Sequence, residues 1–107
     1  MAVAQVSPQD VHARMQETRE LVLLDCRGPD EIEIAAVTGT LNIPMNDIEQ
    51  RMGELDKAAE IVVMCHHGVR SLAVANFLAE HGFTSVASMS GGIHAWSQTV
   101  DGDVPTY

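Results

Sequence analysis

Hydrophobic and polar positions divide the chain into short apolar runs separated by longer segments of mixed polarity. The apolar runs at 21–26, 61–64 and 85–89 predict strands, and the segment 39–44 predicts a briefer one. The run at 61–64 is continuous and rich in β-branched residues. Such a run is typical of a central parallel strand that is covered on both faces.

The intervening segments predict helices. Ser7 and Pro8, followed by Asp10, are typical of a helix cap and first turn, and we expect this helix to end near Arg19. A longer helix is expected at 71–81, with Gly82 just beyond its end. Its predicted inner face comprises Val74, Phe77, Leu78 and His81. Shorter helices are expected after the turn at 28–31, from Pro44 to about Met52, and after Gly91-Gly92.

Strands that alternate with helices indicate the α/β class, with a parallel sheet flanked by helices on both faces. A length of 107 residues fits one domain, 1–107, with a core at about 7–98 and a loosely held polar tail at 99–107. Ligands of such sheets bind beyond the carboxyl ends of the strands. The residue at the carboxyl end of the run 61–64 is Cys65.

Composition narrows the classes of partner. A hydrophobic fraction of 46% excludes a disordered chain, and a net charge of −9 disfavours nucleic acid and anionic membranes. No apolar run approaches the ~20 residues that span a bilayer. The N-terminus lacks a basic flank and an apolar h-region, so we expect a cytoplasmic protein. A monomer is the default for this size.

An anion site on this acidic chain must be built locally, from backbone N–H groups or a positioned arginine.

The chain has two cysteines, Cys26 and Cys65, which are too few for a disulfide scaffold and fit no CxxC pattern. We expect both to be free thiols in a reducing compartment. Cys65 begins a segment in which a buried strand ends and a helix starts five residues later. That segment is Cys65-His66-His67-Gly68-Val69-Arg70-Ser71.

A connection this short must curl around its first side chain. Its N–H groups, and those of the following helix turn, would then point at the Cys65 sulfur, lower the pKa of the thiol and hold the charge of a persulfide. Gly68 permits a positive φ in the curl. Arg70 can face an oxyanion or brace the loop, and Ser71 is placed to cap the helix.

The two histidines of this segment, and Cys26 on a neighbouring strand, each allow a functional and a structural interpretation. His66 and His67 either add donors near the sulfur or point to solvent, and no third ligand accompanies them, so we expect no metal. Cys26 ends a neighbouring strand and is either a resolving thiol for Cys65 or a small apolar filler, which we favour. We expect a structural charge cluster of Asp25, Arg27 and Glu31, and packing or surface roles for Trp96, His12, His81 and His94.

Three segments together resemble the rhodanese family of single-domain sulfurtransferases, from about Ser7 to Trp96. One segment runs from Asp25-Cys26-Arg27 to Gly39-Thr40-Leu41-Asn42-Ile43-Pro44, and the others are 65–71 and Gly91-Gly92-Ile93-His94-Ala95-Trp96. Two departures are Ala35-Ala36, where the family often has Gly-His, and Cys26, where valine is more frequent. Both lie outside the 65–71 segment.

The resemblance implies a five-stranded parallel sheet flanked by helices and a sulfurtransferase whose catalytic residue is Cys65. Residues 66–70 would form its active-site loop. Cys65 would accept a sulfane sulfur from a donor such as thiosulfate and pass it to cyanide, a thiol or a sulfur-carrier protein. The resemblance implies neither a metal nor an organic cofactor.

Three other functions remain open. Related folds with a Cys–Arg loop are phosphatases, but their loop has one residue more than the four between Cys65 and Arg70. Many rhodanese-like domains are non-catalytic binding or regulatory modules, usually with the cysteine replaced. A redox or arsenate-handling protein would use Cys26 and Cys65 as a pair, which requires Cα atoms about 4.4–6.8 Å apart.

Overall fold

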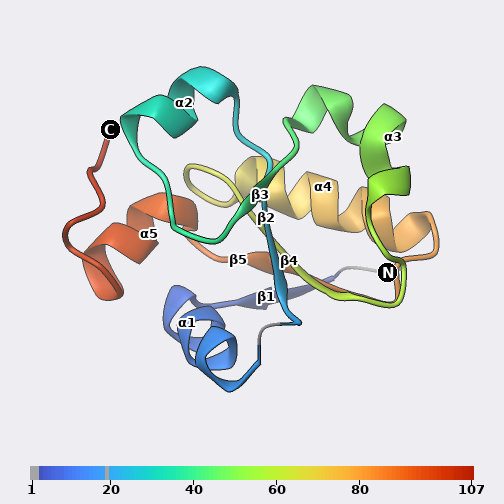
Figure 1. Cartoon of the computed structure of the whole chain (residues 1–107), viewed down its shortest axis with the longest axis horizontal. Coiled ribbons are helices and arrows are strands. Elements are labelled where there is room, and N and C mark those ends of the chain that lie inside the picture. Colours follow the sequence, from blue (N-terminus) through green and yellow to red (C-terminus); the bar gives the residue numbers. More distant parts are fainter. Residues whose placement is uncertain (1–2, 19) are drawn as a thin grey trace.

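The computed structural model describes residues 3–18 and 20–107, and Figure 1 shows its strands surrounded by helices. Strands and helices alternate along the chain. In chain order the elements are β1 (Ala4–Val6), α1 (Pro8–Glu17), β2 (Val22–Asp25), α2 (Pro29–Ile34), β3 (Leu41–Asn42), the 3₁₀ turn η1 (Met45–Asp47), α3 (Ile48–Arg51), η2 (Met52–Glu54), β4 (Glu60–Met64), α4 (Val69–Glu80), β5 (Ser85–Met89) and α5 (Gly92–Thr99).

The strands form one five-stranded sheet in the order β1-β5-β4-β2-β3, and every pair is parallel. The expected α/β fold with a five-stranded parallel sheet is therefore confirmed. β4 lies at the centre, as its apolar run predicted. The register pairs Asp25 of β2 with Met64 of β4, so these two strands end at the same level. Cys26 and Cys65 follow directly at this carboxyl edge.

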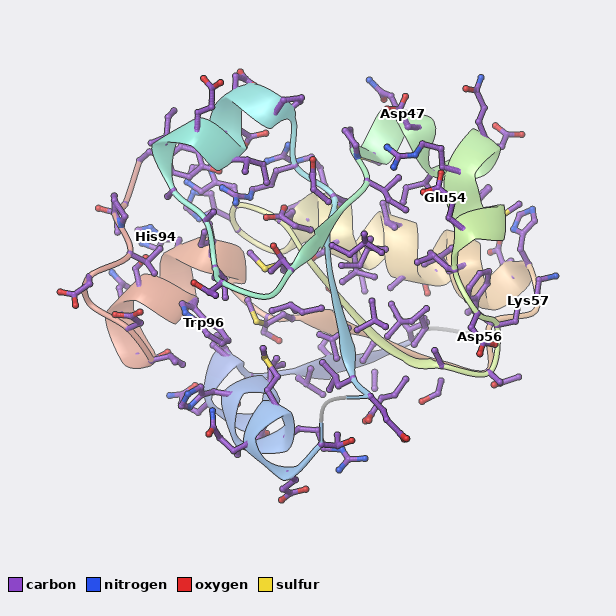
Figure 2. The ribbon with its side chains drawn as sticks, viewed as in Figure 1. Asp47, Glu54, Asp56, Lys57, His94 and Trp96 are labelled. Carbon is purple, nitrogen blue, oxygen red and sulfur yellow. The ribbon has the colours of Figure 1, made fainter. Side chains whose placement is uncertain are left out.

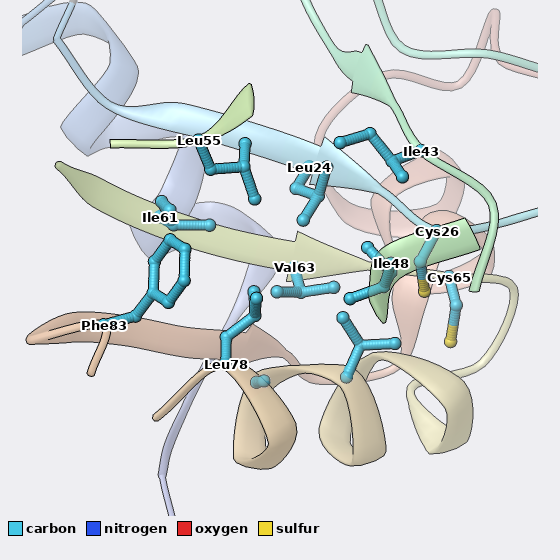
Figure 3. Close-up of a cluster of buried hydrophobic side chains, with 12 residues drawn as sticks. Leu24, Cys26, Ile43, Ile48, Leu55, Ile61, Val63, Cys65, Leu78 and Phe83 are labelled. Carbon is cyan, nitrogen blue, oxygen red and sulfur yellow. The ribbon is translucent and has the colours of Figure 1, made fainter. Parts of the chain in front are cut away.

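Helices cover both faces of the sheet, and side chains of β4 alternate between two buried layers. Ile61, Val63 and Cys65 belong to one layer, which includes side chains of α3 and α4. Figure 3 shows this layer between the strands and α4. Val62 and Met64 belong to the other, which packs against α1 and α5. No helix within the described ranges is long and apolar enough to cross a membrane.

The helix starting at Ser7 is confirmed, because the Ser7 hydroxyl accepts a hydrogen bond from the Asp10 N–H at 3.1 Å. α1 ends at Glu17, and the expected end at Arg19 lies outside the described residues. Figure 2 shows Trp96 of α5 directed toward this helix, where its ring meets that of His12 edge to face at 5.8 Å. The packing role expected of Trp96 is confirmed.

Several boundaries differ from the sequence-based expectation. β1 was not expected from the polarity pattern, because it has three largely exposed residues and pairs only with β5. The helix expected after Pro44 is divided into η1, α3 and η2. α4 begins at Val69 instead of Ser71, and His81 is exposed beyond its end, with Nδ1 2.7 Å from the Phe77 carbonyl oxygen. Gly82 does follow that end, with φ +92°.

A buried ion pair joins Asp25 and Arg27 at the end of β2. Arg27 is 0% exposed, and its guanidinium donates to the two carboxylate oxygens of Asp25 at 2.9 and 2.7 Å. It also donates to the Ala35 carbonyl at 2.8 Å. The charge cluster is thus confirmed for this pair, whereas the Glu31 carboxylate turns to Arg70.

The C-terminal tail packs against the body of the protein, which differs from the loose tail that its polar composition led us to expect. Val104 is buried, and the Tyr107 hydroxyl accepts from Arg27 at 2.9 Å and donates to Glu31 at 2.9 Å. A phenol needs such partners when its ring is partly buried. The tail therefore reaches the end of β2 and the start of α2.

We expect Arg27→Met to lower the free energy of unfolding by about 3–5 kcal/mol, because it leaves the Asp25 carboxylate buried without its partner. The measurement is urea denaturation at neutral pH. Arg14→Met is the matched control, since Arg14 forms exposed pairs with Glu17 and Glu60, and a much smaller change is expected. Equal losses for the two variants would contradict this role of the buried pair.

Candidate active site

Cys65 lies just beyond β4 and is 1% exposed. The chain curls through residues 66–68 and enters α4, and Gly68 adopts the expected positive φ, +105°. The N–H groups of Gly68 and Ser71 donate to Cys65 Sγ at 3.1 and 3.3 Å. The prediction that the loop directs N–H groups at this sulfur is confirmed.

We had expected Ser71 to cap α4. It lies instead inside the first turn of that helix. Its hydroxyl lies 3.5 Å from Cys65 Sγ and 2.8 Å from the Ser88 hydroxyl of β5, and it donates to the Gly68 carbonyl at 3.1 Å. Because α4 starts two residues early, this side chain turns inward toward the sulfur. Ser71 and Ser88 are site residues that the sequence analysis did not assign.

The environment favours the Cys65 thiolate. Interactions with Cys26, with the Ser71 hydroxyl and with the Ser71 and Gly68 N–H groups outweigh burial and lower the pKa of Cys65 to about 4. The same contact with Cys65, together with burial, raises the pKa of Cys26. The pair therefore holds one negative charge, on Cys65, while Cys26 stays protonated.

N–H groups at the start of α5 donate to the outward-facing carbonyls of the Cys65 loop. The Ile93 N–H donates to the Cys65 carbonyl at 2.8 Å, and the His94 N–H donates to the His66 carbonyl at 3.2 Å. Gly92 has φ +60°, and a Cβ there would collide with both of these carbonyl oxygens. The Gly91-Gly92 pair noted in the sequence thus permits this close approach, a role that sequence analysis had not assigned.

Arg70 braces the loop, which was one of its two expected roles. Its guanidinium donates to both carboxylate oxygens of Glu31, at 2.7 and 2.8 Å, and so ties α4 to α2. Glu31 also accepts from the Gly28 N–H at 3.1 Å and from Tyr107. Arg70 above all, with the Gly28 and Tyr107 hydrogen bonds, lowers the pKa of Glu31 to about 2.

The remaining loop side chains lie at the mouth of the site. Val69 is 80% exposed, and His67 is also exposed. His66 is half-buried and stacks on the Tyr107 ring, with centroids 3.7 Å apart. His67 contacts His66 and His94, with ring centroids at 4.0 and 4.9 Å, and Figure 2 shows His94 beside the C-terminal tail. No group of three or more potential ligands among the described residues has metal-binding geometry.

Comparison with known proteins identifies the family. A family model described as "Rhodanese-like domain" matches residues 7–99. The chain belongs to the rhodanese-like domain family. A rhodanese-related protein from Thermoplasma volcanium has the same fold, with a TM-score of 0.84 and 24% identity over 97% of this chain and 99% of that one.

Several curated relatives of this rhodanese-like chain are named as sulfurtransferases. It is 31% identical to "Sulfurtransferase" of Allochromatium vinosum, covering 90% of each chain. It is 33% identical to "Thiosulfate sulfurtransferase GlpE" of Coxiella burnetii, covering 73% of each. It is 36% identical to a chloroplastic rhodanese-like/PpiC domain-containing protein of Arabidopsis thaliana, over 98% of this chain but only 38% of that protein.

The Glu31–Arg70 pair predicts a pH-dependent stability. The folded-state pKa of Glu31, about 2, lies below its ordinary value of 4.5, so its contribution is fully present above 4.5 and is lost as the pH falls toward 2. We expect Glu31→Gln to lower the free energy of unfolding by about 1–3 kcal/mol at neutral pH. The gap from wild type should close between pH 4.5 and 2.

Chemical denaturation across this pH range measures the gap. Glu33→Gln, on the same helix and exposed, is the matched control and should leave stability unchanged. A gap between wild type and Glu31→Gln that stays constant down to pH 2 would contradict the assignment.

Proposed function

We propose that the protein is a sulfurtransferase in which Cys65 accepts a sulfane sulfur as a persulfide and passes it to a nucleophilic acceptor. The observation that carries this proposal is the convergence of the Gly68 and Ser71 N–H groups on the buried Cys65 sulfur. The names of the Allochromatium and Coxiella relatives support the same activity. The latter name also supports thiosulfate as donor.

Sulfur transfer follows from a thiolate held at this position. In the first step Cys65 Sγ attacks the outer sulfur of a donor such as thiosulfate, a new S–S bond forms, and sulfite leaves with the electron pair of the bond that breaks. In the second step cyanide, a thiol or a sulfur-carrier protein attacks the outer sulfur of the persulfide. The S–S bond breaks and Cys65 regains its thiolate, so neither a metal nor an organic cofactor is required.

The size of the loop around Cys65 favours transfer of a sulfur atom over binding of a phosphate group. Its N–H groups already contact Sγ itself, at 3.1 and 3.3 Å, and the N–H groups of α5 hold two of its carbonyls in place. Both guanidinium arms of Arg70 are engaged by Glu31. A ring closed this tightly fits one added sulfur better than a tetrahedral phosphate.

The surroundings of the loop agree with a small donor and a thiol or protein acceptor. His67 and Val69 are exposed at its mouth, where an acceptor would meet the persulfide. We also propose a reducing, cytoplasmic setting, because two cysteines are too few for a disulfide scaffold. We further propose that the domain acts as a monomer.

The direct test is the mass of the intact protein after incubation with thiosulfate and desalting. The mass should rise by one sulfur atom in the wild type, because the Cys65 thiolate takes up the sulfane sulfur, and should not rise in Cys65→Ser. The absence of a gain with several sulfane donors, in a folded protein, would contradict the proposal. Turnover of an aryl phosphate that depends on Cys65 would favour a phosphatase instead.

Arg70→Ala tests whether the braced guanidinium also serves the donor anion. We expect kcat/KM for thiosulfate to fall by about tenfold or more, or about 1.4 kcal/mol per tenfold, because a cation next to the Cys65 loop is lost. Expressed as free energies, the loss in kcat/KM should exceed the loss in the free energy of unfolding. Arg51→Ala is the control, since Arg51 pairs with Glu54 away from the site. Wild-type activity in Arg70→Ala would show that Arg70 does not engage the substrate.

A further inference from the structure

The backbone brings the two cysteines of this chain to matching positions on neighbouring strands. Cys26 follows the last pair of the β2–β4 register, Asp25 and Met64, and its N–H donates to the Met64 carbonyl at 3.0 Å. The ladder thus continues to the level of Cys65. Neighbouring strands lie about 4.8 Å apart, and disulfides span Cα separations of about 4.4–6.8 Å. The two backbones are therefore at a separation that a disulfide can bridge.

The two thiols also face the same side of the sheet. Successive strand side chains alternate between faces, and Cys26 and Cys65 belong to the same buried layer, together with Leu24 and Val63. Figure 3 shows the two sulfurs next to each other at the edge of this layer. Each residue is only 1% exposed, and the interaction between the two thiols lowers the pKa of Cys65 and raises that of Cys26. Cys26 is thus a core residue that contacts the reactive sulfur.

Different elements approach Cys65 Sγ. Cys26 comes from the end of β2, whereas the N–H donors of Gly68 and Ser71 come from the loop and α4. Cys26 and Cys65 are both free and buried. A nucleophile is therefore available beside the sulfur that carries the persulfide.

We propose that Cys26 is an internal thiol that reduces the sulfur carried by Cys65 to sulfide and closes a Cys26–Cys65 disulfide. This inference rests on the proposed persulfide chemistry. Cys26 Sγ attacks Cys65 Sγ, a Cys26–Cys65 bond forms, and the bond to the outer sulfur breaks. The outer sulfur leaves as hydrosulfide with the electron pair. The sulfane sulfur is the oxidant, and the two thiols are oxidised.

Persulfide formation removes the obstacle that keeps Cys26 inactive in the resting protein. There, the neighbouring Cys65 thiolate and burial raise the pKa of Cys26 and hold it as a thiol. Once Cys65 carries a sulfur, the negative charge moves one bond away, and the Cys26 proton can leave with the hydrosulfide. A dithiol reductant must then reopen the disulfide. The persulfide thus has two fates, transfer to an external acceptor or release as sulfide.

The test follows one loading event with no acceptor or reductant present. Wild type and Cys26→Ser are incubated with thiosulfate, desalted, and followed by intact mass and by sulfide release. Wild type should gain one sulfur, release one equivalent of sulfide, and end two hydrogen atoms lighter than the reduced protein. Peptide mapping should then link Cys26 to Cys65.

Cys26→Ser should gain the sulfur and retain it, with a persulfide lifetime at least about tenfold longer than in wild type, because an adjacent thiol acts at a high effective concentration. Cys26→Val, which keeps the packing volume with an apolar side chain, provides a second comparison if the serine variant does not fold. The inference is supported if the wild type releases sulfide quickly and forms the Cys26–Cys65 link while a folded variant does neither. One folded variant is enough for this comparison.

The outcomes separate this inference from the proposed function. Wild type that gains sulfur and holds it as long as the variants, without sulfide, overturns the role of Cys26 and leaves the sulfurtransferase proposal intact. A disulfide between two chains in place of the internal one also overturns it. The absence of any gain in wild type and both variants overturns the proposed persulfide chemistry itself, and this inference with it.

Discussion

The convergence of N–H groups on one buried sulfur is the constraint on which the rest of the structure depends. A loop whose N–H groups point inward must turn its carbonyls outward, and buried carbonyls need donors. Two N–H groups in the first turn of α5, from Ile93 and His94, supply them to Cys65 and His66. Gly92 lets the two backbones come this close. The final helix is therefore part of the anion site, although none of its side chains is bonded to the sulfur in the described structure.

A second network connects this loop to the strand beside it. The buried Asp25–Arg27 pair, the Tyr107 hydroxyl and the Glu31 carboxylate lead in turn to Arg70 on α4. The network holds the Arg70 guanidinium where it interacts with the Cys65 thiolate, within a chain whose net charge is −9. It also explains why an acidic protein can hold an anion, since the site depends on local donors rather than on the overall field.

The sequence predicted those parts of the fold whose causes are local. The run 61–64 marked the central strand, Ser7 and Pro8 marked a helix start, and Gly68 marked the turn with positive φ. Contacts between distant positions left no such signal. Tyr107 meets Glu31 across a separation of 76 residues, and β1 has only three residues, too few to show a period. Ser71 was misplaced because α4 starts two residues early, which turns that side chain toward the sulfur. The resemblance to the rhodanese family supplied the fifth strand, which the polarity pattern had not.

The titration of the Cys65 thiolate tests the central claim, that the loop and its neighbours stabilise an anion at this sulfur. Ultraviolet absorbance of thiolate follows the ionisation in the folded protein, and loss of the low-pH step in the Cys65→Ser variant assigns that step to Cys65. We expect a midpoint near pH 4 and a thiolate that persists at all higher pH values. A midpoint near the ordinary value of 9.0, with the fold intact, would contradict it.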